Sequence, residues 1–123
     1  MAVEASNTAA LGMTPGQAIE ILQRDLGLTM KDLQITLDTT PRNIERWIHE
    51  QAHPQTKARQ QLAQLMELHR HLAAMFTDRD SARAWLNAPS RYLGGITPVE
   101  AMRGGRLDRA RAALLALDAG IYI

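Results

Sequence analysis

The stretch MKDLQITLDTTPRNIERW, residues 30–47, decides the fold class. Its core LQITL alternates apolar and polar residues, a pattern that is typical of a half-buried strand. Met30, Leu33 and Leu37 instead follow the period of a helix, and no partner strand is visible elsewhere in the sequence. We therefore predict a helix here, and the rest of the stretch shows what this helix packs against.

A short polar turn and a second helix follow the first one. Residues 38–40 form the turn, and Pro41 suits the first position of a helix because its missing N–H is not needed there. A short helix, a three-residue turn and a second helix with an exposed start make the helix-turn-helix pattern. The apolar residues expected to hold the two helices together are Leu33, Leu37, Ile44 and Trp47.

The start of the second helix carries side chains that suit the major groove of DNA. Arg42 and Arg46 can pair with guanine, Asn43 with adenine, and Thr40 with a phosphate. We predict these four residues as the DNA-binding set. Charged helix faces are also common on proteins that bind no DNA, so the spacing alone leaves a simple helical hairpin as an equal alternative.

Thr-Pro pairs mark the starts of further helices. Thr14-Pro15, Thr40-Pro41 and Thr97-Pro98 each combine a good N-cap with a proline at the first helical position. Thr14 with Gln17, and Thr97 with Glu100, also predict capping boxes. With the apolar periodicity, they predict helices over about 15–25, 30–37, 41–53, 56–76, 78–87, 97–102 and 107–118. The last of these helices is expected to carry Leu107, Ala110, Leu114 and Leu117 on one apolar face. The fold class predicted is all-α, with an N-terminal helix-turn-helix bundle followed by a small helical domain.

The helix predicted over 56–76 is the longest and has two apolar stripes. One stripe includes Leu62 and Ala73, and the other includes Leu68 and Leu72. A helix that is apolar on two sides packs on two sides. We expect it to bridge the two halves of the chain or to contribute to a homodimer.

Composition and charge exclude several classes of function. The 123 residues include no cysteine, and the formal net charge is only +1, with neither half strongly basic. The start of the chain lacks a basic signal-peptide region, and no apolar run approaches the roughly 20 residues of a membrane helix. His49 and His53 are poorly placed for a metal, and no nucleophile motif is present. We expect no enzyme activity, no cofactor, no metal and no membrane partner.

The helix-turn-helix stretch resembles the Xre/phage-repressor class of DNA-binding domains. The match rests on Leu33, Leu37, Ile44 and Trp47. Gln34 replaces the usual alanine, and Asp38 replaces the usual glycine. Aspartate tolerates the left-handed backbone conformation that this turn is expected to need.

A second and more specific resemblance covers about 40 residues at the C-terminal end. The matching elements, in order, are Trp85-Leu86, Asn87-Ala88-Pro89, Leu93-Gly94-Gly95, Thr97-Pro98, Gly105, Leu114, Leu117 and Gly120-Ile121-Tyr122. They resemble the C-terminal toxin-binding domain of the Xre/MbcA/ParS antitoxin family. With the helix-turn-helix stretch, the resemblance covers nearly the whole chain after residue 12.

This resemblance implies a cytoplasmic antitoxin of a bacterial type II toxin–antitoxin system. The implied partner is a RES-domain toxin that degrades NAD, and the antitoxin would occlude the toxin's active-site cleft with C-terminal elements. Many family members also repress their own operon, so operator DNA and a homodimer are implied as well. The alternative is a transcriptional regulator whose C-terminal half serves only dimerisation.

The end of the chain is the expected toxin-binding surface. Ile121, Tyr122 and Ile123 are too apolar to favour water, and an apolar tail that ends in a carboxylate could plug a nucleotide cleft. The other possibility is that this tail folds back onto its own core. Arginine is favoured at binding hot spots. We therefore expect four arginines to frame the interface: Arg91, Arg103, Arg106 and Arg109.

Two further expectations concern the organisation of the chain. Gly94-Gly95 lacks the lysine and the glycine spacing of a phosphate-binding loop, so we interpret it as a tight turn. The predicted organisation is a disordered segment at 1–12, a helix-turn-helix domain at 13–60, a connecting helix at 61–76 and a toxin-binding domain at 77–123.

Overall fold

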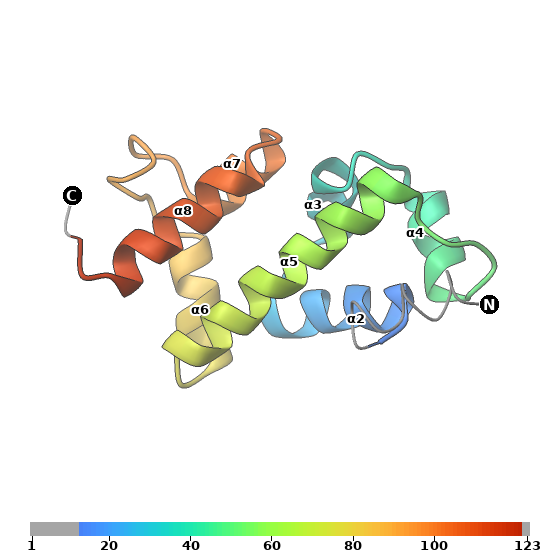
Figure 1. The fold of residues 1–123 in the computed structure, drawn as a ribbon, viewed down its shortest axis with the longest axis horizontal. Helices are drawn as coiled ribbons and strands as arrows, with labels where there is room; N and C mark the ends of the chain where they lie inside the picture. The colour runs from blue at the N-terminus through green and yellow to red at the C-terminus, as the bar shows by residue number, and fades with distance from the viewer. Residues whose placement is uncertain (1–12, 122–123) are drawn as a thin grey trace.

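The computed structural model describes residues 13–121. Within that range the chain forms seven helices and no strand, so the all-α prediction is confirmed (Figure 1). The helices are α2 (Pro15–Leu26), α3 (Met30–Thr36), α4 (Pro41–Ile48), α5 (Thr56–Met75), α6 (Arg79–Leu86), α7 (Pro98–Arg103) and α8 (Leu107–Asp118). The third helix ends at Ile48, earlier than expected, and none of the helices in this range is long and apolar enough to cross a membrane.

Threonine caps fix where four of the helices begin. The hydroxyls of Thr14, Thr29, Thr40 and Thr97 each accept a hydrogen bond from the backbone N–H three residues later. Each bond satisfies one of the unpaired donors at a helix start. The capping boxes predicted at Thr14 and Thr97 are confirmed. A third capping box, between Thr29 and the Asp32 carboxylate, was not predicted.

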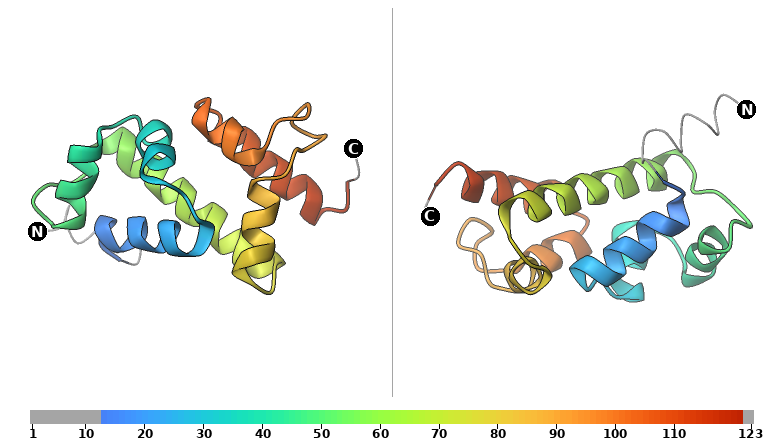
Figure 2. Two further views of the ribbon diagram at one scale, coloured as in Figure 1. Left: turned by 180° about the vertical axis from the view of Figure 1, so that it is seen from behind. Right: turned by 90° about the horizontal axis from the view of Figure 1, so that it is seen from below.

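The long helix α5 holds the two halves of the chain together. It packs against α2 in the N-terminal half and against α6 and α8 in the C-terminal half. Figure 2 shows α5 along one side of the molecule, with α2, α3, α6 and α7 along the opposite side. The predicted bridge between the halves is confirmed.

The side chains of α5 form the middle of the main core cluster. Its buried residues are Leu62, Leu65, Leu68 and Leu72, and the cluster continues into α2, α3, α4, α6, α7 and α8. Ala73, which was expected in a buried stripe, is exposed. The helix begins at Thr56, as predicted. Among the described residues, the core is therefore continuous through both halves.

Two turns in the N-terminal half need a left-handed backbone. Gly27 closes α2 with φ 69°, and Asp38 opens the turn between α3 and α4 with φ 51°. Glycine has no Cβ to clash in this conformation, and aspartate is one of the few other residues that tolerate it. The left-handed conformation expected at Asp38 is confirmed.

Truncating a buried side chain near the end of α5 is expected to destabilise the protein. Leu72 is fully buried, so Leu72→Ala should lower the free energy of unfolding by about 2–5 kcal/mol through lost burial and a residual cavity. Urea unfolding followed by far-UV circular dichroism measures this change. Gln64→Ala, an exposed position on the same helix, should change it by less than about 0.5 kcal/mol. An equal effect of both variants would contradict this placement of Leu72.

Candidate functional site

An exposed apolar surface lies at the C-terminal end of α8. Tyr92, Leu117 and Ile121 are large apolar side chains that remain exposed there, Ile121 by 52%. They line a hollow of about 320 Å³, whose complete lining is Trp85, Ser90, Arg91, Tyr92, Ala113, Ala116, Leu117 and Ile121. A group of exposed apolar side chains around a hollow is typical of an interaction site. We call it the C-terminal hollow.

The loop before α7 forms one wall of the C-terminal hollow. The carbonyl of Ser90 accepts hydrogen bonds from the N–H groups of Leu93 and Gly95, and the Ser90 N–H donates to the carbonyl of Ile96. Gly94 and Gly95 have φ values of 76° and 100°, which only glycine adopts readily. The interpretation of Gly94-Gly95 as a tight turn is confirmed.

The end of α8 forms the opposite wall. The N–H of Gly120 donates to the carbonyl of Leu117, and the N–H of Ile121 donates to the carbonyl of Ala116. Gly120 is left-handed, with φ 76°, so the helix ends in a glycine cap that directs Ile121 to the hollow. Tyr122 and Ile123, predicted to bind the toxin, lie outside the described residues.

Leu117 corrects the face predicted for the last helix. It was expected to be buried with Leu107, Ala110 and Leu114, but it is 38% exposed while those three are buried. Successive residues of an α-helix are rotated by about 100° around the helix axis. Leu114, Leu115 and Leu117 therefore cannot all lie on one narrow face. Three leucines within four positions therefore indicate a second apolar face on this helix, and the sequence analysis overlooked this pattern.

The four predicted interface arginines do not lie together. Arg91 lines the C-terminal hollow. Arg103, Arg106 and Arg109 lie at the other end of α8, which has 12 residues and is therefore about 18 Å long. Arg106 is paired with Asp108 at 3.0 Å, whereas Arg109 is exposed and makes no ion pair with another described residue.

Of the predicted DNA-binding residues, Thr40, Arg42 and Asn43 lie at the start of α4, whereas Arg46 lies in its last turn. Thr40 caps the helix, and the Asn43 side-chain amide donates to the Thr39 hydroxyl at 3.0 Å. Arg42 and Arg46 are exposed, are four residues apart on one face and have no ion-pair partner within residues 13–121. The two arginines are therefore the side chains on α4 that remain available to a polyanion.

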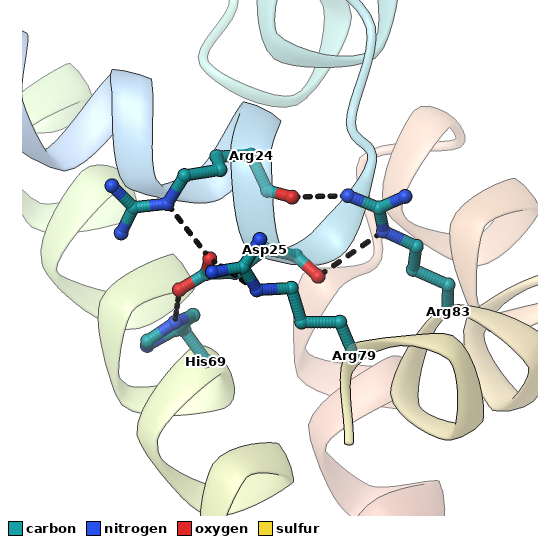
Figure 3. Close-up of polar contacts among 5 residues, drawn as sticks. All are labelled: Arg24, Asp25, His69, Arg79 and Arg83. Atoms are coloured by element: carbon teal, nitrogen blue, oxygen red, sulfur yellow. Dashed lines mark hydrogen bonds and ion pairs between the residues drawn. The ribbon is translucent and has the colours of Figure 1, made fainter.

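Asp25 is the centre of a charged cluster between α2, α5 and α6 (Figure 3). Its carboxylate accepts hydrogen bonds from Arg24 at 3.0 Å and His69 at 2.9 Å, and forms an ion pair with Arg79 at 3.2 Å. Arg83 donates to the backbone carbonyls of Arg24 and Asp25. These contacts join the last turn of α2 to the C-terminal half.

Two more histidines, His71 and His49, also lie close to carboxylates. His71 lies 3.0 Å from Asp118, and His49 lies 3.6 Å from Glu45. Across the described part of the chain, no three histidine, aspartate or glutamate side chains gather at a point where a metal ion could be held. The His69–Asp25 and His71–Asp118 pairs instead tie α5 to α2 and to α8.

The ion pairs of two aspartates predict a loss of stability in acid. The Arg24 guanidinium holds the pKa of Asp25 below its ordinary value. Burial opposes ionisation of Asp32, but hydrogen bonds from Thr29 and Arg103 outweigh it, so the pKa of Asp32 is also lowered. Both contributions are complete above the unfolded pKa of about 3.9 and are lost as the pH falls through the folded values.

We therefore expect the free energy of unfolding to fall as the pH is lowered from 5 to 3. Urea titrations at several pH values measure it. Asp32→Asn removes one titrating group and should flatten this part of the profile. A profile as steep as that of the parent protein would contradict a role for Asp32 in the acid sensitivity.

Comparison with known proteins places this architecture in a family. Residues 71–120 match the model of the antitoxin Xre/MbcA/ParS C-terminal toxin-binding domain. The mycobacterial cidal antitoxins MbcA of Mycobacterium bovis and Mycobacterium tuberculosis are each 32% identical to the chain over 98 residues, which span 80% of this chain and 86% of each relative. The chain belongs to the Xre/MbcA/ParS antitoxin family. The resemblance inferred from the sequence is confirmed.

A solved structure extends this antitoxin relationship to the whole fold. A chain in the crystal structure of the M. tuberculosis MbcT–MbcA toxin–antitoxin complex matches this antitoxin with a TM-score of 0.66 and 29% sequence identity. The match covers 88% of this chain and 96% of that chain. The shared fold therefore includes the N-terminal helices as well as the segment that matches the family model.

Proposed function

We propose that this antitoxin binds and neutralises a cognate RES-domain toxin that degrades NAD, in a type II system of the cytoplasm. The observation that carries the proposal is the position of the C-terminal hollow. It lies within the segment that matches the toxin-binding domain, and its exposed apolar side chains include Tyr92, Leu117 and Ile121. Burial of such side chains favours association, because it removes apolar surface from water.

Neutralisation by this surface needs no chemistry from the antitoxin. Ile121 and the residues after it would enter the toxin's cleft, and Tyr92 and Leu117 would pack around the entrance. Arg91 lines the same hollow and can pair with a carboxylate of the toxin. A filled cleft excludes the nucleotide, so occlusion alone accounts for inhibition.

The decisive experiment measures NAD in cells that express a neighbouring RES-type gene. NAD should collapse when that gene is expressed alone and recover when this antitoxin is expressed with it. An inactive variant of the toxin controls for the burden of expression. NAD that falls equally with and without this antitoxin would contradict neutralisation.

We further propose that the N-terminal half binds the operator of its own operon. Two exposed arginines on one face of α4 favour this second function. Arg42, in the first turn, can contact bases, and Arg46 lies one turn further along the same face. Helix-turn-helix proteins commonly bind as two-fold dimers, so a homodimer is part of the proposal. The DNA-binding function is assigned to residues 13–60 and the toxin-binding function to residues 77–123.

A further inference from the structure

Two contacts from the C-terminal half hold the corner between α2 and α3. On one side of the corner, Arg83 of α6 donates to the last carbonyls of α2. A cation at that position also complements the negative end of the helix dipole. A Cβ added to Gly27 would lie 3.3 Å from the Arg83 side chain, so the corner and the arginine are closely packed.

The second contact joins α7 to the start of α3. One carboxylate oxygen of Asp32 accepts the Thr29 N–H at 2.9 Å and completes the capping box. The other carboxylate oxygen accepts a hydrogen bond from the Arg103 Nε. Asp32 is 4% exposed and is the only buried side chain with a charge among the described residues. A buried carboxylate that loses its cation is strongly destabilised, so this pair constrains both helices.

The Asp32–Arg103 pair lies between the two proposed binding surfaces. Arg103 is the last residue of α7, and a short turn at Gly104-Gly105 leads from it into α8, which carries the C-terminal hollow. Asp32 lies in α3, which packs against α4. A displacement of α7 therefore acts on α3 through a direct ionic contact, and α3 in turn supports the arginines of α4.

We propose that Arg103 is a positioning residue that fixes α3 and α4 relative to α7 and α8, and thereby couples toxin binding to operator binding. This assignment replaces the toxin contact predicted for Arg103. The coupling rests on the proposed function, whereas the positioning of the helices does not. Coupling is reciprocal, so a toxin that shifts α7 changes operator affinity by the same factor by which the operator changes toxin affinity.

The positioning role is tested by a distance measurement. The chain has no cysteine, so Glu45→Cys on α4 and Ala119→Cys after α8 give two unique, exposed sites for spin labels. Pulsed electron resonance should give one narrow distance distribution in the parent protein. Arg103→Ala should broaden or shift it, and Arg109→Ala, which removes an exposed arginine in the first turn of α8, should not. An unchanged distribution in Arg103→Ala overturns the proposal.

Stability provides an independent check that Arg103 acts through Asp32. Arg103→Ala leaves a buried carboxylate without its cation, and Asp32→Asn removes that charge. The double variant should therefore be no less stable than Arg103→Ala, because the two residues form one interaction. Destabilisations that simply add would show that Arg103 and Asp32 act separately and would overturn the assignment.

Affinities separate the positioning role from a direct contact. Arg103→Ala should weaken operator binding by about fivefold or more and should reduce the effect of added toxin on that binding. Weaker toxin binding with unchanged operator binding would instead make Arg103 a toxin contact. If the parent protein binds no operator, the proposed DNA function fails, and the distance distribution alone decides the positioning role.

Discussion

Removal of Ile121–Ile123 is expected to abolish neutralisation of the toxin. Each large apolar side chain that becomes buried at an interface contributes about 1.5–3 kcal/mol, so losing three should weaken binding by at least about a thousandfold. Calorimetry with the purified toxin measures the affinity, and the NAD level in co-expressing cells measures the consequence. Full protection by the truncated chain would refute occlusion by the tail.

The truncated chain should keep its fold, which makes the result interpretable. Ile121 is half exposed and follows the cap of α8, so its loss removes little from the core. Leu115→Asp is the matched control. Leu115 lies on α8, near the truncated residues, and its side chain is 56% exposed. It lines a different hollow, between α5 and α8. If Leu115→Asp abolishes binding and the truncation does not, the toxin occupies that other face.

Replacing Arg42 and Arg46 with alanine is expected to abolish specific operator binding. A lost arginine contact to DNA costs about 1–3 kcal/mol, so the double variant should bind at least about thirtyfold more weakly. Electrophoretic mobility shifts at matched salt measure the affinity. The salt dependence of binding should also decrease if one of the two arginines contacts a phosphate.

A second double variant controls for the change in charge. The double variant Arg70→Ala and Arg106→Ala also removes two positive charges, from exposed positions on α5 and just before α8. Its operator affinity should change little. Equal losses in both double variants would mean that total charge, and not the face of α4, governs binding.

The helix boundaries could be predicted because their signals are local. A Thr-Pro pair supplies both the cap and the first helical residue within two positions, and Thr14 and Thr97 begin their helices as expected. The left-handed conformation of Asp38 could be predicted for the same reason, because it depends on the backbone preference of aspartate itself. Contacts within a few residues are encoded by short patterns.

The arrangement of the interface could not be predicted in the same way. Asp32 looks like an ordinary charge on a helix in the sequence, because its hydrogen-bond partner Arg103 is 71 residues away. The separation of Arg91 from Arg103 and Arg106 depends on the length and direction of α8 in the folded chain. Such facts depend on tertiary packing, which spacing alone does not encode.

The continuous core has a consequence for how a cell would remove this protein. Because α5 contributes buried residues to both halves, unfolding at either end of that helix withdraws support from the other end as well. Regions that share one core open together as a single cooperative unit. Proteolytic clearance would then be all-or-none for each molecule, and the two proposed partners, the toxin and the operator, would be released in the same event.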